Sequence, residues 1–199
     1  MIAIIDYGMG NLRSVEKAFA HLGADVRTTD DPAFLKSAQK IVVPGVGAFD
    51  HAVRELKRKG LFGPIVEAVK GGKPYVGLCL GFQLLFRRSE EGKEDGFGLL
   101  EGEVRKFPAG HKVPHMGWND VAFPAGDCPY WKGMPANPFF YFVHSYYAAP
   151  QETQARLGKT SYGIEFASVI WKKNIFATQF HPEKSQSNGL RLLKNIVEN

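Results

Sequence analysis

The chain has 199 residues, of which 44% are hydrophobic and 23% charged, and its formal net charge is +5. This composition is typical of a globular protein with one large core, and no apolar run approaches the ~18 residues that cross a bilayer. The first residues, MIAIIDYG, form an apolar run with no basic segment and no small-residue cleavage site, so we expect no signal peptide.

The excess positive charge is not gathered into a nucleic-acid motif. The longest basic cluster, RELKRKG at 54–60, has no interleaved aromatic residue and is typical of a solvated helix face. The two cysteines, Cys79 and Cys128, have different neighbours and make no disulfide framework. We therefore expect a reduced, cytoplasmic protein with no nucleic-acid or membrane partner.

Up to about position 92, short apolar runs alternate with amphipathic ones. In chain order, the pattern predicts a strand at 2–6, a helix at 11–23, a strand at 24–29, a strand from 40 that Pro44 stops, helical sequence at 49–69 broken at Gly60 and Gly63, a strand at 73–79 and a helix at 81–92. Such alternation predicts an α/β fold, with an open, mostly parallel sheet and helices on both faces.

The second half of the chain differs in composition. Gly, Pro and aromatic residues first suggest loops and short antiparallel strands, and β-branched and aromatic runs follow at 138–150, 161–174 and 175–183. A last helix is predicted over Gln186–Glu198. With no convincing linker, we expect a single domain over 1–199.

A Gly-x-Cys-x-Gly arrangement lies where the strand 73–79 meets the next predicted helix. In the equivalent serine motif, a tight turn between two glycines projects the nucleophile from the carboxyl end of a strand. The positive helix end favours a Cys79 thiolate, and the amide of Leu80 is placed to bind an oxyanion. For this motif alone, a buried cysteine flanked by glycines for close packing is the alternative.

His181 is the histidine best placed to act as a base. It ends an apolar run, Pro182 stops the strand, and Glu183 can then hydrogen-bond the imidazole and fix its tautomer. A cysteine, a histidine and an orienting carboxylate are the parts of an activated thiol nucleophile. A surface ion pair is the alternative for this His-x-Glu pair, but its predicted place at the carboxyl end of a strand favours catalysis.

The segment PGVGAF follows the third predicted strand. Its glycines let the backbone turn an N–H toward a ligand without steric cost. We therefore expect the second oxyanion donor at Gly45 or Val46, with an ordinary tight turn as the alternative.

Together, these residues resemble the triad-type class I glutamine amidotransferases. That family has a Pro-Gly-x-Gly oxyanion turn, a Gly-x-Cys-x-Gly-x-Gln elbow and a late His-Pro-Glu, which stand here at 44–47, 77–83 and 181–183. The resemblance covers essentially the whole chain. It implies a flavodoxin-like sheet with an antiparallel flank, and hydrolysis of glutamine to glutamate and ammonia.

Within that family, the chain resembles the glutaminase subunits of imidazole glycerol phosphate synthases, which act in histidine biosynthesis. The segments DYGMGN, PGVGAF, PHMGWN, FVHSYY and HPEKS carry this likeness. It implies that ammonia passes to a (β/α)8-barrel synthase subunit that makes imidazole glycerol phosphate and aminoimidazole carboxamide ribonucleotide. Since no barrel precedes Asn199, we expect the synthase as a separate partner in a heterodimer.

The resemblance also implies roles for single residues. Cys79 forms a γ-glutamyl thioester, His181 takes the thiol proton and later activates water, and Glu183 orients His181. The oxyanion donors are Leu80 and the peptide between Gly45 and Val46. Further positions are implied to hold glutamine (Gln83, Glu91, His144, Ser145 and Tyr146, with Glu90 the alternative to Glu91) and to face the synthase (Asn11, Trp118, Tyr141 and Lys184).

The oxyanion turn suggests gating by the partner. In the family, this turn is associated with a peptide that points the wrong way until the synthase is engaged. A β-branched residue at Val46 makes a flip to positive φ more costly than glycine would. We therefore expect the isolated chain to be a poor glutaminase.

Other site types find little support in the sequence. Gly8 and Gly10 lack the third glycine of a dinucleotide fingerprint because Arg13 stands there, and no P-loop or zinc spacing occurs. We expect no metal and no cofactor. The rival interpretations are a glutaminase subunit for pyridoxal phosphate, anthranilate or aminodeoxychorismate synthesis, a non-catalytic flavodoxin-like scaffold module, and a general cysteine hydrolase.

Overall fold

The computed structural model describes residues 1–124 and 126–199. The helices are α1 (Leu12–His21), α2 (Phe34–Ser37), α3 (Phe49–Arg58), α4 (Phe62–Lys70), α5 (Leu80–Gln83) and α6 (Gln186–Glu198), with 3-10 turns η1 (Pro129–Trp131) and η2 (Pro182–Lys184). The strands are β1 (Ile2–Ile5), β2 (Val26–Thr29), β3 (Lys40–Gly45), β4 (Tyr75–Cys79), β5 (Phe86–Ser89), β6 (Leu100–Lys106), β7 (His115–Asp120), β8 (Phe139–His144), β9 (Tyr146–Pro150), β10 (Arg156–Tyr162), β11 (Ile164–Lys172) and β12 (Ile175–Thr178).

One large sheet organises the molecule. Its order is β2-β1-β3-β4-β12-β11-β9-β6-β5, with β10 paired to β11. The five strands from β2 to β12 are parallel, and antiparallel pairings begin at β11 and continue through β9 to β6. This confirms the predicted α/β class, with a mostly parallel sheet and an antiparallel flank.

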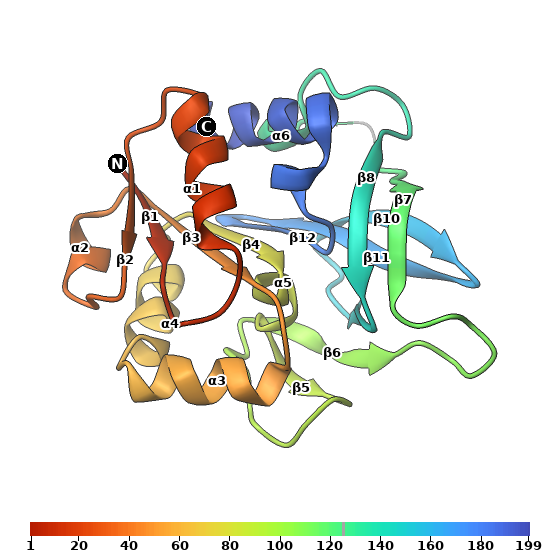
Figure 1. Ribbon diagram of the computed structural model, residues 1–199, viewed down its shortest axis with the longest axis horizontal. Helices are drawn as coiled ribbons and strands as arrows, with labels where there is room; N and C mark the ends of the chain where they lie inside the picture. Colours follow the sequence, from red (N-terminus) through yellow and green to blue (C-terminus); the bar gives the residue numbers. More distant parts are fainter. Residues whose placement is uncertain (125) are drawn as a thin grey trace.

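Helices cover both faces of the parallel strands, as Figure 1 shows. On one face, α1 and α6 bury residues such as Phe19 and Leu192 against Val42 and Val76. On the other, α3 and α4 pack against the alternate strand positions, such as Ala3 and Val43. Strands buried on both faces explain the continuous apolar runs of the sequence.

The hairpin of β7 and β8 forms a separate two-stranded antiparallel sheet. In Figure 1 it stands on the side of the molecule opposite β2 and α2. Its inner side chains, including Phe140 and Phe142, join the core that α1 and α6 cover. The hairpin therefore buries one of its two faces against the body of the protein.

The predicted helix at 81–92 is wrong beyond its first turn. The helix α5 ends at Gln83, and Phe86–Ser89 instead forms the strand β5, which pairs with β6. The apolar run LLF suits either state, and pairing with a strand more than ten residues away decides between them.

Two smaller boundaries also differ from the sequence prediction. The strand β3 continues through Pro44 to Gly45, which pairs with Cys79 in the parallel ladder. The helical segment 49–69 is interrupted before α4, and Gly63 lies inside α4 rather than at a break.

Across the described residues, no helix combines the length and the apolar character needed to span a membrane.

Candidate active site

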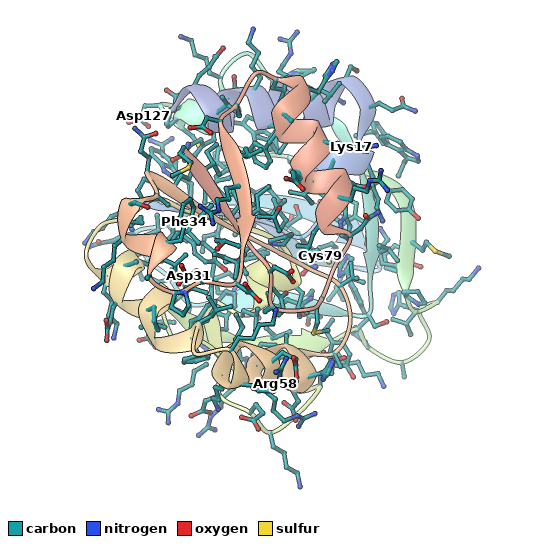
Figure 2. All side chains as sticks on the ribbon, turned by 60° about the vertical axis from the view of Figure 1, so that its left-hand side comes forward. Lys17, Asp31, Phe34, Arg58, Cys79 and Asp127 are labelled. Carbon is teal, nitrogen blue, oxygen red and sulfur yellow. The ribbon has the colours of Figure 1, made fainter. Side chains whose placement is uncertain are left out.

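Cys79 lies at the junction of β4 and α5, with φ 54° and ψ −103°. A non-glycine residue at positive φ is strained, and such strain is what a nucleophile elbow imposes on its central residue. The residue is 5% exposed, so its sulfur is almost enclosed by protein. Figure 2 shows Cys79 among the side chains that lie between α1 and α3 in that view.

The two glycines of the elbow allow α5 to lie directly against the sheet. A Cβ on Gly81 would come 1.8 Å from the carbonyl oxygen of Val43, and one on Gly77 would come 2.6 Å from the carbonyl oxygen of Gly81. The hydroxyl of the buried Tyr75 donates to the same Gly81 oxygen at 2.7 Å. The glycine spacing of the motif is thus a packing requirement of the turn that presents Cys79.

His181 lies between β12 and η2, next to Glu183. Its Nδ1 is 2.8 Å from Glu183 Oε1, and both side chains are almost fully buried. Its Nε2 is also buried and has no hydrogen-bond partner among the described residues. Burial disfavours the imidazolium, but the nearby Cys79 sulfur and the Glu183 carboxylate outweigh it and raise the pKa of His181 to about 10. The arrangement favours a protonated His181 imidazole that is held by Glu183.

The segment PGVGAF, in which the sequence predicts an oxyanion donor, begins at the end of β3 and is held by Tyr7. We call it the oxyanion turn. The Tyr7 hydroxyl, fully buried, donates to the carbonyl oxygen of Pro44 at 2.8 Å. A Cβ on Gly45 would lie 2.0 Å from that hydroxyl oxygen, so only glycine fits there. Gly47 takes a φ of +110°, whereas Val46 stays outside the left-handed region. Burial, with a smaller contribution from Cys79, raises the pKa of Tyr7, which keeps the hydroxyl a donor.

A pocket of about 270 Å³ opens beside the cysteine. It is lined by Val46, Gly47, Cys79, Leu80, Gln83, Glu91, Pro114, Val143, His144, Ser145 and Tyr146. Every residue that the resemblance assigns to glutamine therefore lies on one cavity, although these residues come from three separate segments of the chain. Its volume is below the range typical of sites for drug-sized ligands, which suits a single amino acid.

The choice between the two neighbouring glutamates follows from their positions. Glu91 lines the pocket and accepts a hydrogen bond from the Phe49 amide at 2.9 Å, while Glu90 accepts one from the Lys106 amide at 2.7 Å. Burial raises the pKa of Glu91 despite the Phe49 bond, which lowers it. Glu91, rather than Glu90, therefore lines the pocket.

Two pocket residues are engaged with protein groups. The amide nitrogen of Gln83 donates to the Tyr146 carbonyl at 3.0 Å and to Gln179 Oε1 at 3.1 Å, so both of its protons have acceptors. His144 Nδ1 lies 2.8 Å from the same Tyr146 oxygen. Burial lowers the pKa of His144 to about 3, so this imidazole is neutral.

The residues expected to face a partner lie on two neighbouring features. Asn11 and Lys184, both exposed, line a void of about 10 Å³ together with His181, Glu183 and the oxyanion turn. Trp118 and Tyr141 are paired across β7 and β8, with ring centroids 6.3 Å apart.

The hairpin carries an exposed apolar surface on the side away from the core. We call this surface the outer hairpin face; it comprises Met116, Trp118, Phe139, Tyr141 and Val143. Met116, Trp118 and Phe139 are 61%, 46% and 54% exposed, respectively. A contiguous apolar surface of this kind is characteristic of an interaction site.

Sequence reasoning missed four residues that support the site. Tyr7 and Tyr75 hold the two turns, Gln179 donates to Cys79 Sγ at 3.7 Å, and His115 Nδ1 lies 2.9 Å from His144 Nε2. All four lie in or next to the motifs, but only their partners, 6 to 100 residues away, give them a role.

Within 1–124 and 126–199, no group of three or more His, Cys, Asp or Glu side chains is arranged to hold a metal ion.

Comparisons with known proteins agree with this geometry. The family model for "Glutamine amidotransferase class-I" matches residues 3–199. Among solved structures, a "Crystal structure of glutamine amidotransferase" superimposes with a TM-score of 0.79 at 17% identity, covering 100% of this chain and 98% of that one. The "Structure of PurLQS from Thermotoga maritima" gives 0.77 at 18% identity, covering 99% and 97%. At these identities, the structural likeness shows the fold alone.

Two curated relatives are much more similar in sequence. The "Imidazole glycerol phosphate synthase subunit HisH" of Moorella thermoacetica is 53% identical over 99% of this chain and 94% of its own length. The protein of the same name from Syntrophotalea carbinolica is 48% identical over 98% of each. The chain therefore belongs to the class I glutamine amidotransferase family and, within it, to the family of HisH subunits of imidazole glycerol phosphate synthase.

Proposed function

We propose that this chain is the glutaminase subunit of an imidazole glycerol phosphate synthase, and that Cys79, His181 and Glu183 form its catalytic triad. The observation that best supports the proposal is the cysteine at positive φ on a glycine-flanked elbow, beside a buried histidine that is paired with a buried carboxylate. Full-length similarity to HisH subunits gives independent support.

In this mechanism, the Cys79 thiolate attacks the side-chain amide carbon of glutamine. The tetrahedral oxyanion is held by the amide of Leu80 and by the peptide between Gly45 and Val46. His181 Nε2 donates its proton to the leaving nitrogen, so that ammonia departs and a γ-glutamyl thioester remains. His181 then removes a proton from water, which attacks the thioester and releases glutamate and the Cys79 thiolate. Glu183 holds Nδ1–H throughout and stabilises the imidazolium.

The pocket residues have matching roles in the proposal. Glu91 pairs with the α-ammonium group of glutamine, and Gln83 has its Oε1 left to accept from it, since its amide protons are already used. Backbone groups of His144, Ser145 and Tyr146 hold the carboxylate. Glutamine held by these pocket residues would have its side-chain amide carbon at Cys79.

The outer hairpin face, with Asn11 and Lys184, is proposed to bind the (β/α)8-barrel synthase subunit. Asn11 and Lys184 line a void beside His181 and Glu183, and the exposed apolar and aromatic residues of the outer hairpin face suit a stable interface. The synthase would use the ammonia to make imidazole glycerol phosphate and aminoimidazole carboxamide ribonucleotide. The scaffold alternative retains the fold but predicts no glutamine hydrolysis at all.

The test is glutamate release from glutamine by the chain alone, and then with the barrel subunit and its nucleotide. We expect little release alone and strong stimulation by the partner, because the oxyanion turn is then held in its productive form. Cys79→Ala should abolish release, while Cys128→Ala should retain it; burial raises the pKa of Cys128 to about 11, so it is an inert thiol. Equal turnover with and without the partner would contradict gating, and activity in Cys79→Ala would contradict the mechanism.

A further inference from the structure

A chain of hydrogen bonds runs from the β7–β8 hairpin to the nucleophile. It passes in order through Asn119, His115, His144, the Tyr146 carbonyl, Gln83, Gln179 and Cys79. Gln179 is fully buried, and His115, His144 and Gln83 are 3%, 6% and 5% exposed. Buried polar groups in such a chain fix one another's orientation, because an unmade hydrogen bond is costly there.

The polarity near Cys79 is set by a backbone carbonyl. The Tyr146 oxygen can only accept, so the Gln83 group facing it at 3.0 Å is the amide nitrogen. That nitrogen also faces Gln179 at 3.1 Å, which must present its oxygen. The amide nitrogen of Gln179 therefore faces Cys79 Sγ, at 3.7 Å, and donates to it.

In the histidine half of the hydrogen-bond chain, each group donates to the next in the direction of the Tyr146 carbonyl. His144 Nδ1 donates to the Tyr146 oxygen at 2.8 Å, so the neutral ring offers Nε2 as an acceptor. His115 Nδ1 donates to that nitrogen at 2.9 Å, and His115 Nε2 accepts from Asn119 Nδ2 at 3.3 Å. Asn119 is oriented by a second carbonyl, since its nitrogen donates to Ser161 O at 2.9 Å. Burial lowers the pKa of His115 to about 4, so both rings are neutral.

We propose that Gln179 is a positioning residue that holds the Cys79 sulfur by an N–H···S hydrogen bond, and that His115 and His144 act from the hairpin by holding in place the Tyr146 carbonyl that orients Gln83 and Gln179. The bond is stronger to a thiolate than to a thiol, so it favours the nucleophilic form. The link to turnover rests on the proposed function. Because the hairpin carries the outer hairpin face, this series of hydrogen bonds also connects that surface to Cys79.

The test measures the rate of Cys79 alkylation by iodoacetamide against pH in the full chain, in a Cys128→Ala background. This readout needs no glutamine, so it is independent of glutaminase activity. His181 and Tyr7 are the titratable groups that interact with the sulfur, and the Gln179 variants leave both in place. Gln179→Met removes the donor at similar volume, and Gln179→Glu places a carboxylate there instead.

We expect the pH midpoint of alkylation to rise by about 0.5–1 unit in Gln179→Met and further in Gln179→Glu, where like charges repel. Ser168→Ala is the matched control: it removes a buried hydroxyl that bonds to Thr160 at 2.7 Å and takes no part in the hydrogen bonds that lead to Cys79, so it should leave the midpoint unchanged. Unchanged midpoints in both Gln179 variants, with only a lower melting temperature, would overturn the proposal and leave Gln179 a purely structural residue.

A second pair of variants tests the hydrogen-bond chain while Gln179 itself is left unchanged. His115→Phe keeps the stacking on Phe142 and Tyr162 but removes the donor to His144, whereas His115→Asn retains a nitrogen donor near the Nδ1 position. We expect His115→Phe to raise the midpoint and His115→Asn to leave it close to that of the unmodified chain. Equal midpoints in the two His115 variants would refute the hairpin connection. If the unmodified protein released no glutamate with the synthase subunit, while the alkylation midpoints of the variants shifted as expected, the proposed function would be contradicted and the role of Gln179 would stand.

Discussion

The backbone N–H of His181 donates to the carbonyl oxygen of Tyr141 at 2.9 Å. Ser185 adds a second link, because its hydroxyl accepts from the Tyr141 amide at 2.9 Å and donates to the His181 carbonyl at 2.6 Å. The proposed base and the hairpin that carries the outer hairpin face are thus joined by three hydrogen bonds. The backbone position of His181 is therefore tied directly to that of Tyr141 on the hairpin.

Ser185→Ala should therefore weaken this junction. The serine is 1% exposed, and its loss leaves the Tyr141 amide without its acceptor, so we expect a loss of about 1–2 kcal/mol in the free energy of unfolding. Urea denaturation measures it. Ser187→Ala, at an exposed position two residues on, is the control and should change stability by less than about 0.5 kcal/mol. Equal effects in the two variants would show that the junction contributes nothing.

Gly81→Ala and Gly63→Ala should have opposite effects. At Gly81 a Cβ would overlap the Val43 carbonyl, which belongs to a central strand and cannot move, so we expect a loss of about 2–4 kcal/mol. At Gly63, inside α4, a Cβ meets nothing within 4 Å, so alanine should stabilise by about 0.5–1 kcal/mol. Thermal unfolding distinguishes them, and a Gly81→Ala protein of full stability would contradict the packing account of the elbow.

Glu183→Gln should lower kcat by roughly 10²–10⁴-fold with little change in KM. The amide keeps the shape of the carboxylate but neither stabilises the imidazolium nor enforces a proton on Nδ1. Steady-state glutamate release in the presence of the synthase subunit measures both constants. A change confined to KM would assign Glu183 to substrate binding instead.

Acid should destabilise the protein through its two neutral histidines. The pKa values of His115 and His144 are lowered to about 4 and about 3, so below pH 6.5 the unfolded chain binds protons that the folded chain does not. Stability should fall as the pH drops from 6.5 toward 4, by up to about 1.4 kcal/mol per pH unit for each histidine. His115→Phe should reduce that slope by about half, and the same slope in both proteins would contradict the assignment.

Trp118→Ala should weaken binding of the barrel synthase subunit. Trp118 is 46% exposed on the outer hairpin face, and aromatic residues of this kind dominate interface energies, so we expect Kd to rise roughly 30-fold, or about 2 kcal/mol. Isothermal titration calorimetry measures it. Trp171→Ala, on β11, is the matched control and should leave Kd unchanged. If both variants bind normally, the partner uses another surface.

Much of the fold could be predicted because its signals are local. Apolar runs ended by glycine or proline define the parallel strands, and α6 was predicted with its observed bounds. The strand β5 could not be predicted in this way, since Phe86–Ser89 becomes a strand only by pairing with β6. The glycine-flanked turn at Cys79, the pairing of His181 with Glu183 and the turn after β3 could likewise be predicted, because each depends on residues close together in the sequence.

The hydrogen-bond chain that leads to Cys79 could not be predicted from the sequence. Gln179 stands two residues before His181, but its role depends on Cys79, 100 residues away, and on Gln83, 96 residues away. No local pattern marks such a contact. The same holds for Tyr7, whose hydroxyl acts on Pro44, 37 residues further on.

The central claim is that Cys79 carries the γ-glutamyl group during turnover. The most direct measurement is acid quenching of the chain during glutamine hydrolysis with the synthase subunit, followed by mass spectrometry of its peptides. The account predicts a hydrolysable γ-glutamyl adduct on the peptide that contains Cys79 and none on the peptide that contains Cys128. Steady glutamate release with no adduct on Cys79, or with the adduct elsewhere, would contradict it.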